Sequence, residues 1–213
     1  MRLALLQLVS QSLIEPILIR GSSPQLHPYF HELILFLQAH LRDPYPLCKL
    51  EACRILSLLC RHPALNQGMI LYALAIARAS LPVLRHRHAK VRCGGVQLLR
   101  AACCTPYKAK CRGAGTDAIV DLIGYTAEDS VPIAAFYGGH RTVNYLAELT
   151  VDAAVSVRLE TSRMLAEFIT TLPDRYDHRT RVVAYILNAV NDDDPEVVST
   201  AMDALAIAGA EYE

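Results

Sequence analysis

Apolar residues recur at spacings of three and four along most of the chain, and few stretches alternate between apolar and polar residues. Spacings of three and four place apolar side chains on one face of an α-helix. The pattern therefore predicts helices and no substantial strands. Their expected ranges are 2–19, 25–41, 45–61, 67–84, 88–104, 115–124, 139–150, 153–171, 177–190 and 195–209.

A short polar motif precedes the second helix of several predicted helical hairpins. The motif occurs at residues 43–47 (DPYPL), 86–92 (HRHAKVR), 152–158 (DAAVSVR) and 194–198 (DPEVV). An Asp at this position accepts hydrogen bonds from the free amides of the first helical turn, and Pro is tolerated at the first helical position. We therefore expect each motif to mark the start of a helix, with His86 replacing the acid in the second motif.

The motifs recur with a period that indicates a repeat protein. The apolar residues taken as equivalent in the four motifs are Leu47, Val91, Val157 and Val197. They are separated by 44, 66 and 40 residues, and two of these intervals match the 40–47-residue period of HEAT and armadillo repeats. The residues eight positions further on are large aliphatics that we expect to be buried, namely Ile55, Leu99, Leu165 and Leu205.

One helical hairpin cannot bury its apolar face alone, so such hairpins stack on one another. We therefore expect an all-α solenoid of HEAT or armadillo-type antiparallel hairpins over residues 1–213, with about four to five repeats. The long interval places an irregular insertion at about 104–138. Neither end reads as a polar capping repeat, which fits a fragment of a longer array.

Composition favours a soluble cytoplasmic protein. The chain is 53% hydrophobic, which suffices for a sizeable core, but no apolar run approaches the roughly 20 residues needed to cross a bilayer. Seven cysteines form no CxxC pair and mostly occupy apolar positions of helical patterns. Such cysteines are typical of free, buried thiols in a reducing compartment.

The net charge of zero hides an asymmetry along the chain. Residues 1–112 carry 15 of the 21 lysines and arginines but four acids, and residues 113–213 carry the other six bases and 17 acids. The predicted protein-binding residues lie in the most basic stretch, and they are Arg85, Arg87, Lys90 and Arg92.

Three interpretations of this basic stretch remain open. In the first, Arg92 and Arg158 sit at equivalent positions and reach acids of neighbouring turns. In the second, the stretch docks an acidic protein partner. In the third it binds nucleic acid, but the aromatic residues of a stacking platform are missing. We favour the first two together, because helical solenoids present broad protein-binding surfaces.

Other candidate sites are more simply explained by structure. His27 and His31 lack a third metal ligand, and Cys60 and His62 point to different sides of a helix. Residues 113–117 lack the strand and lysine of a phosphate loop, and we expect Thr116 or Asp117 to cap a helix. Residues 192–194 read as capping acids. We therefore expect no catalytic residue, cofactor or metal.

The segments 43–46, 86–92, 174–176 and 191–197 together resemble the HEAT-repeat dynein axonemal assembly factors, in particular factor five of that series. The resemblance implies a cytoplasmic, non-catalytic factor that assembles dynein arms together with dynein chains and chaperones, and without a membrane. Val198 departs from the pattern, since an Arg is typical there. The alternatives are another HEAT adaptor, such as a transport or phosphatase scaffold, and a nucleic-acid-binding solenoid.

Overall fold

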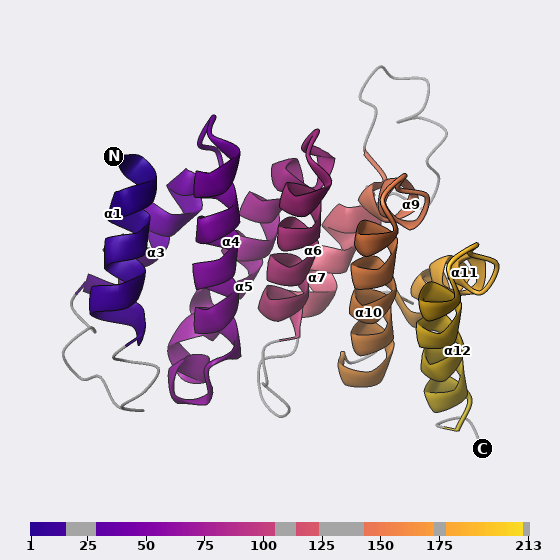
Figure 1. The fold of residues 1–213 in the computed structure, drawn as a ribbon. Coiled ribbons are helices and arrows are strands. Elements are labelled where there is room, and N and C mark those ends of the chain that lie inside the picture. Colours follow the sequence, from indigo (N-terminus) through magenta and orange to yellow (C-terminus); the bar gives the residue numbers. More distant parts are fainter. Residues whose placement is uncertain (16–28, 105–113, 124–142, 173–177, 211–213) are drawn as a thin grey trace, which may run out of the picture. The chain divides into compact units, whose positions relative to one another are not determined.

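The fold is known from a computed structural model, which describes residues 1–15, 29–104, 114–123, 143–172 and 178–210 (Figure 1). Within these ranges every regular element is a helix. The chain divides into two compact units, Met1–Lys110 (unit 1) and Cys111–Glu213 (unit 2).

Unit 1 consists of helices that pair as hairpins. Its α-helices are α1 (Arg2–Val9), α3 (Phe30–His40), α4 (Pro46–Arg61), α5 (Asn66–Ser80) and α6 (Ala89–Cys103). A π-helical turn η1 (Ser10–Ile14) continues α1, and the 3-10 turns η3 (Pro63–Leu65) and η4 (Leu81–Arg85) flank α5. Helix α3 pairs with α4 and α5 with α6, while α4 and α6 share the most extensive interface.

Unit 2 has the same organisation. Its helices are α7 (Ala114–Ile123), α9 (Tyr145–Thr150), α10 (Val155–Thr171), α11 (His178–Ala189) and α12 (Pro195–Ala210). Helix α9 pairs with α10 and α11 with α12, and the second helices α10 and α12 lie side by side. The predicted all-α class of stacked helical hairpins is confirmed within each unit.

The polar motifs mark helix starts as predicted. Helices α4 and α12 begin at Pro46 and Pro195, where the missing amide proton costs nothing. Helices α6 and α10 begin at Ala89 and Val155, each within two residues of the expected start.

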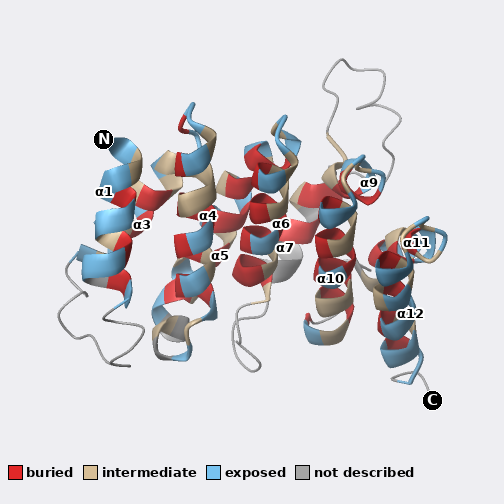
Figure 2. Ribbon diagram, in the orientation of Figure 1, coloured by how far each residue is buried: buried red, intermediate tan, exposed pale blue. Residues whose placement is uncertain are grey.

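Buried and exposed positions alternate along the helices (Figure 2). Three of the four predicted core residues, Ile55, Leu99 and Leu165, are fully buried. The prediction for Leu205 is wrong, because this side chain is only partly buried. Helix α12 instead buries its small residues, and Ala201 and Ala204 are each 1% exposed. Small side chains allow α12 to approach α10 closely.

The predicted alignment of the first motif is also wrong by one residue. Leu47 is 46% exposed, whereas Cys48 next to it is 1% exposed. Val91, Val157 and Val197 are buried as expected. The buried position of the first repeat is therefore Cys48, and Leu47 faces outward.

The predicted insertion at about 104–138 lies mostly outside the described residues. Its described part is α7, which matches the helix expected at 115–124. The helix begins at Ala114, so Thr116 and Asp117 lie within its first turn and the prediction that one of them precedes the helix as a cap is wrong. A single solenoid of four to five repeats stays a prediction.

One described stretch, Gly68–Arg85, is long and apolar enough to span a bilayer by length and composition. Its residues Met69, Ala73, Ile76 and Ala77 are buried within unit 1, where α5 contacts α4 and α6. The expectation that no apolar run approaches the length of a bilayer span is therefore wrong for this stretch. Of the window, 39% is buried inside the structure, and the core helix of a soluble protein can meet the same criterion.

Candidate functional site

Four equivalent turns precede α4, α6, α10 and α12, the second helices of their hairpins. Each turn contains a hydrogen bond of the same type. In each turn the first side chain accepts from the backbone N–H two residues later. The pairs are Asp43 and Tyr45 at 2.8 Å, His86 and His88 at 3.2 Å, Asp152 and Ala154 at 2.8 Å, and Asp192 and Asp194 at 2.9 Å. These side chains therefore fix the turn itself and leave the first helical amides to other partners.

Asp194 serves as the helix cap that the sequence predicted. Its Oδ1 accepts from the backbone N–H of Glu196 at 3.0 Å and of Val197 at 3.3 Å. Asp43 and Asp152 were expected to do the same, but each accepts a hydrogen bond within its turn, and α4 and α10 have no side-chain cap hydrogen bond. The capping interpretation is thus confirmed for the fourth motif alone.

In three of the turns, the residue six positions after the first turn residue is basic. Its side chain donates a hydrogen bond to a backbone carbonyl at or just before the turn. Lys49 Nζ donates to the carbonyl oxygen of Leu41 at 2.9 Å, and Arg92 Nη1 donates to that of His86 at 2.7 Å. Arg158 Nη1 donates to the carbonyl of its own turn residue Asp152 at 2.9 Å. Val198 occupies this position in the fourth motif and has no such donor.

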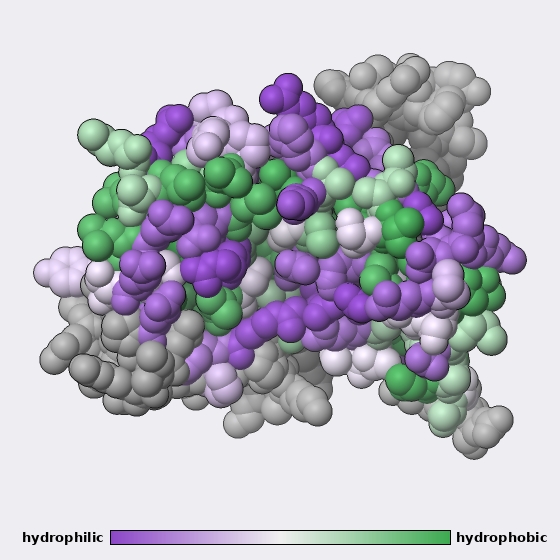
Figure 3. Space-filling view, viewed as in Figure 1, coloured by the Kyte–Doolittle hydropathy of each residue, from purple (hydrophilic) through white to green (hydrophobic). Residues whose placement is uncertain are grey.

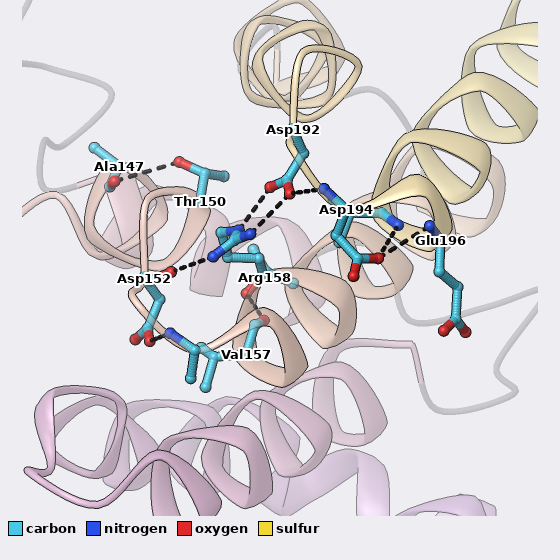
Figure 4. Close-up of polar contacts among 11 residues, drawn as sticks. Ala147, Thr150, Asp152, Val157, Arg158, Asp192, Asp194 and Glu196 are labelled. Carbon is cyan, nitrogen blue, oxygen red and sulfur yellow. Dashed lines mark hydrogen bonds and ion pairs between the residues drawn. The ribbon is translucent and has the colours of Figure 1, made fainter.

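Arg158 also joins two neighbouring turns of unit 2 (Figure 4). Its Nε and Nη2 donate to the two carboxylate oxygens of Asp192 at 2.6 and 2.8 Å, and the two side chains are only 14% and 7% exposed. The hydrogen bond from Arg158 lowers the pKa of the Asp192 carboxyl. The prediction that Arg158 reaches an acid of the next turn is confirmed.

In unit 1 a related ion pair links the first helix to the first turn. Arg2 Nε lies 3.2 Å from Asp43 Oδ2, whose side chain is 6% exposed. Two of the turn acids are therefore held from a different helix by an arginine. These two ion pairs therefore stabilise the packing of helices against turns.

The predicted binding residues Arg85, Arg87, Lys90 and Arg92 follow one another from the end of η4 to the first turn of α6, and we call them the basic rim. Arg85, Arg87 and Lys90 are exposed, whereas Arg92 is partly buried. Arg92 donates to the carbonyls of His86 and of Arg87, at 2.7 and 3.1 Å, so it fixes the turn that carries Arg87. Their role in binding stays a prediction.

His86 takes the place of the turn acid within this rim. Burial, and then the nearby Lys49, His88, Arg87 and Arg92, lower the pKa of its imidazole. The rim therefore favours a neutral ring at this position, with Nδ1 accepting from the His88 N–H.

The cysteine and histidine candidates show no feature of a reactive site. Burial raises the pKa of the Cys60 thiol to about 12, so it is protonated at neutral pH and a poor nucleophile. His31 Nδ1 lies 3.2 Å from the Tyr72 hydroxyl, and its proposed metal partner His27 lies outside the described residues. No cluster of three or more metal-ligating residues occurs in the described part of the chain.

A groove between α10 and α12 was not predicted from the sequence. It has a volume of about 380 Å³ and is lined by Arg163, Ala166, Glu167, Thr170, Thr200, Asp203, Ala204 and Ile207. We call it the α10–α12 groove. Its only sequence signal is the spacing of these residues on two helices, which becomes visible once the helices are known to be neighbours.

Helical hairpins that pack through their second helices, with polar side chains concentrated at the turns, define an α-helical repeat protein. The chain belongs to the family described as dynein axonemal assembly factor 5-like, TPR repeats, whose model matches residues 1–112 and 102–213. TPR units, like HEAT units, are helix–turn–helix repeats.

The chain is similar to a protein of Xenopus laevis named dynein axonemal assembly factor 5, with 23% identity over 213 residues. The match covers 100% of this chain and 21% of the relative, so the chain spans about a fifth of its length. Among solved structures, an engineered protein matches 83% of this chain and 85% of its own, with 16% identity and a TM-score of 0.34.

Proposed function

We propose that this chain is a non-catalytic protein-interaction scaffold in the cytoplasmic assembly of axonemal dynein arms. Family membership over both units carries the proposal. The name of the frog relative describes a dynein axonemal assembly factor, and its similarity extends along the whole chain. Dynein chains and chaperones are the proposed partners.

Within this function, we propose that the basic rim docks an acidic segment of a partner protein. Arg85, Arg87 and Lys90 are exposed at the end of η4, on the following turn and at the start of α6, and Arg92 donates to the backbone of that turn. Basic side chains gathered on a fixed turn attract acidic partners and speed their encounter.

The assembly role is tested by recovering the tagged chain from the cytoplasm of ciliating cells. We expect axonemal dynein chains and chaperones to co-purify from the cytoplasmic fraction. Recovery of phosphatase subunits or transport receptors, without dynein chains, would instead support a different repeat adaptor.

The docking role of the rim is tested by charge reversal. We expect Arg87→Glu combined with Lys90→Glu to slow association with the recovered dynein chain by about tenfold at low salt and to flatten its salt dependence. The single variants Arg87→Glu and Lys90→Glu are also measured. Each is compared with Arg61→Glu, which makes an equal charge change at an exposed residue of α4. Equal effects of the rim and Arg61 variants would contradict a local docking site.

A further inference from the structure

We propose that the α10–α12 groove binds an amphipathic helix of a partner protein, with lysine or arginine flanking its apolar stripe. This inference rests on the proposed function only in assuming a protein partner. Its residues belong to unit 2 and are separate from the basic rim.

The shape of the groove suits a helix. Helix α10 lines it with residues 163, 166, 167 and 170, and α12 with residues 200, 203, 204 and 207. Each set follows the spacing i, i+3, i+4 and i+7, so each helix presents one continuous face over two turns. A third helix laid between two such faces places its own residues of the same spacing into the groove.

The floor and walls leave room for apolar side chains. Ala166 and Ala204 are small, which allows a close approach, and Ile207 is 52% exposed at one wall. The Thr170 hydroxyl donates to the carbonyl of Ala166 at 3.0 Å, so its polar group is satisfied within α10. Hydrophobic residues lie among hydrophilic ones over α10 and α12 on the face shown in Figure 3.

The charge around the groove selects a basic partner. The lining arginine, Arg163, is neutralised from its own surroundings, since Nη2 lies 2.7 Å from Glu196 and Nη1 lies 3.9 Å from Glu160. Two further lining residues, Glu167 and Asp203, are acidic. Lysines or arginines beside the apolar stripe of a bound helix would complement the exposed Asp203 and the net negative charge of this lining.

The test measures binding of a defined probe to the whole chain by fluorescence anisotropy. The probe is a labelled helical peptide of about 18 residues, roughly 27 Å long, with leucine at i, i+3, i+4 and i+7 and lysine elsewhere. A peptide of identical composition with scrambled order serves as the control for amphipathicity. We expect saturable binding of the amphipathic peptide and little binding of the scrambled one.

Two matched pairs of variants locate the site. Ile207 and Met202 are both on α12 and both 52% exposed, but only Ile207 lines the groove. We expect Ile207→Lys to weaken binding about tenfold and Met202→Lys to weaken it less than about twofold. In the same way Asp203→Lys is compared with Asp193→Lys, which changes an exposed acid of the turn before α12.

Equal loss in both members of a pair would overturn the proposal, as would equal binding of the scrambled peptide. A preference for the corresponding leucine and glutamate peptide would overturn the assigned charge. Displacement of the probe by an RNA oligonucleotide, or binding of the same residues to anionic vesicles, would assign the groove to another kind of ligand. Failure here leaves dynein co-purification intact, so the two proposals fail separately.

Discussion

Two adjacent glycines in α6, Gly94 and Gly95, lie close to side chains of neighbouring helical elements in unit 1. A Cβ at Gly95 would lie 3.0 Å from Val83 Cγ1 and 3.1 Å from Leu84 Cδ2, both buried core side chains. We expect Gly95→Ala to lower the free energy of unfolding by about 1–3 kcal/mol through overpacking, measured by urea denaturation.

Gly209 in α12 provides the control for this substitution. A Cβ there meets nothing within 4 Å, so Gly209→Ala gains helix propensity without a clash. We expect a gain of up to about 1 kcal/mol. Stabilisation by both substitutions would show that η4 moves aside to accommodate the methyl group at residue 95.

The lowered pKa of His86 gives unit 1 a pH dependence with a definite sign. Between the ordinary pKa near 6.5 and the lower value in the folded chain, the unfolded state binds the proton and the folded state does not. The free energy of unfolding therefore falls as the pH falls through this window. Melting curves of the wild type between about pH 7 and about pH 5 measure the fall.

In His86→Asn the side chain keeps an acceptor for the His88 N–H and cannot gain a proton. We expect this variant to lose less stability over the same pH range than the wild type does. An identical loss in both would place the pH dependence on other histidines.

The residue-level errors of the sequence analysis have a physical cause. The first motif contains two prolines, and taking Leu47 as the counterpart of Val197 placed Asp43 opposite Asp193, one residue away from its structural counterpart Asp192. The helices begin at Pro46 and Pro195, and the equivalent turn residues are Asp43 and Asp192. Which proline starts a helix depends on the turn before it, which residue types alone did not reveal.

Between elements, Arg158 and Asp192 form a bidentate, nearly buried ion pair in unit 2. In Arg158→Met the side-chain stem remains, but the nearly buried carboxylate of Asp192 loses two charged hydrogen bonds. We expect a loss of about 1.5–3 kcal/mol in the free energy of unfolding, measured by denaturation at neutral pH.

This pair also predicts a response to acid. Because Arg158 lowers the pKa of Asp192, its stabilisation is present above the ordinary pKa of 3.8 and is lost as the pH falls through the folded value. Arg158→Met should remove that part of the acid sensitivity. Arg163→Met breaks an exposed pair with Glu196 and a longer contact of 3.9 Å to Glu160, and it should cost under about 1 kcal/mol. An equal cost for the two variants would contradict the importance of burial.

Helices were predictable because their signals are local. Apolar spacing and the polar motifs gave the starts of α4, α6, α10 and α12 within two residues. The α10–α12 groove was not predictable, because its lining residues are some 40 positions apart and mostly small or polar, which is ordinary for any exposed helix. Only the packing of α10 against α12 gives them a common role.

At the scale of the whole molecule, opposite charges on the two halves of the chain predict self-association. The net charge is zero and the isoelectric point is about 7.1, so molecules do not repel one another near neutral pH. We expect association at about 10 mM salt, where the screening length is about 30 Å, and its reversal near 0.15 M, where it is about 8 Å. Static light scattering measures this, and salt-independent scattering would contradict it.

The buried thiols of unit 1 can report local opening of this unit through the rate at which they are labelled. All six described cysteines lie in this unit, and burial raises the pKa of Cys53 and Cys60 to about 12. An alkylating reagent therefore reaches these two sulfurs only when the helices around them separate. In repeat proteins one part can open while the rest stays folded. The labelling rate of Cys53 and Cys60 therefore measures local opening of unit 1 by itself, with no probe added to the chain.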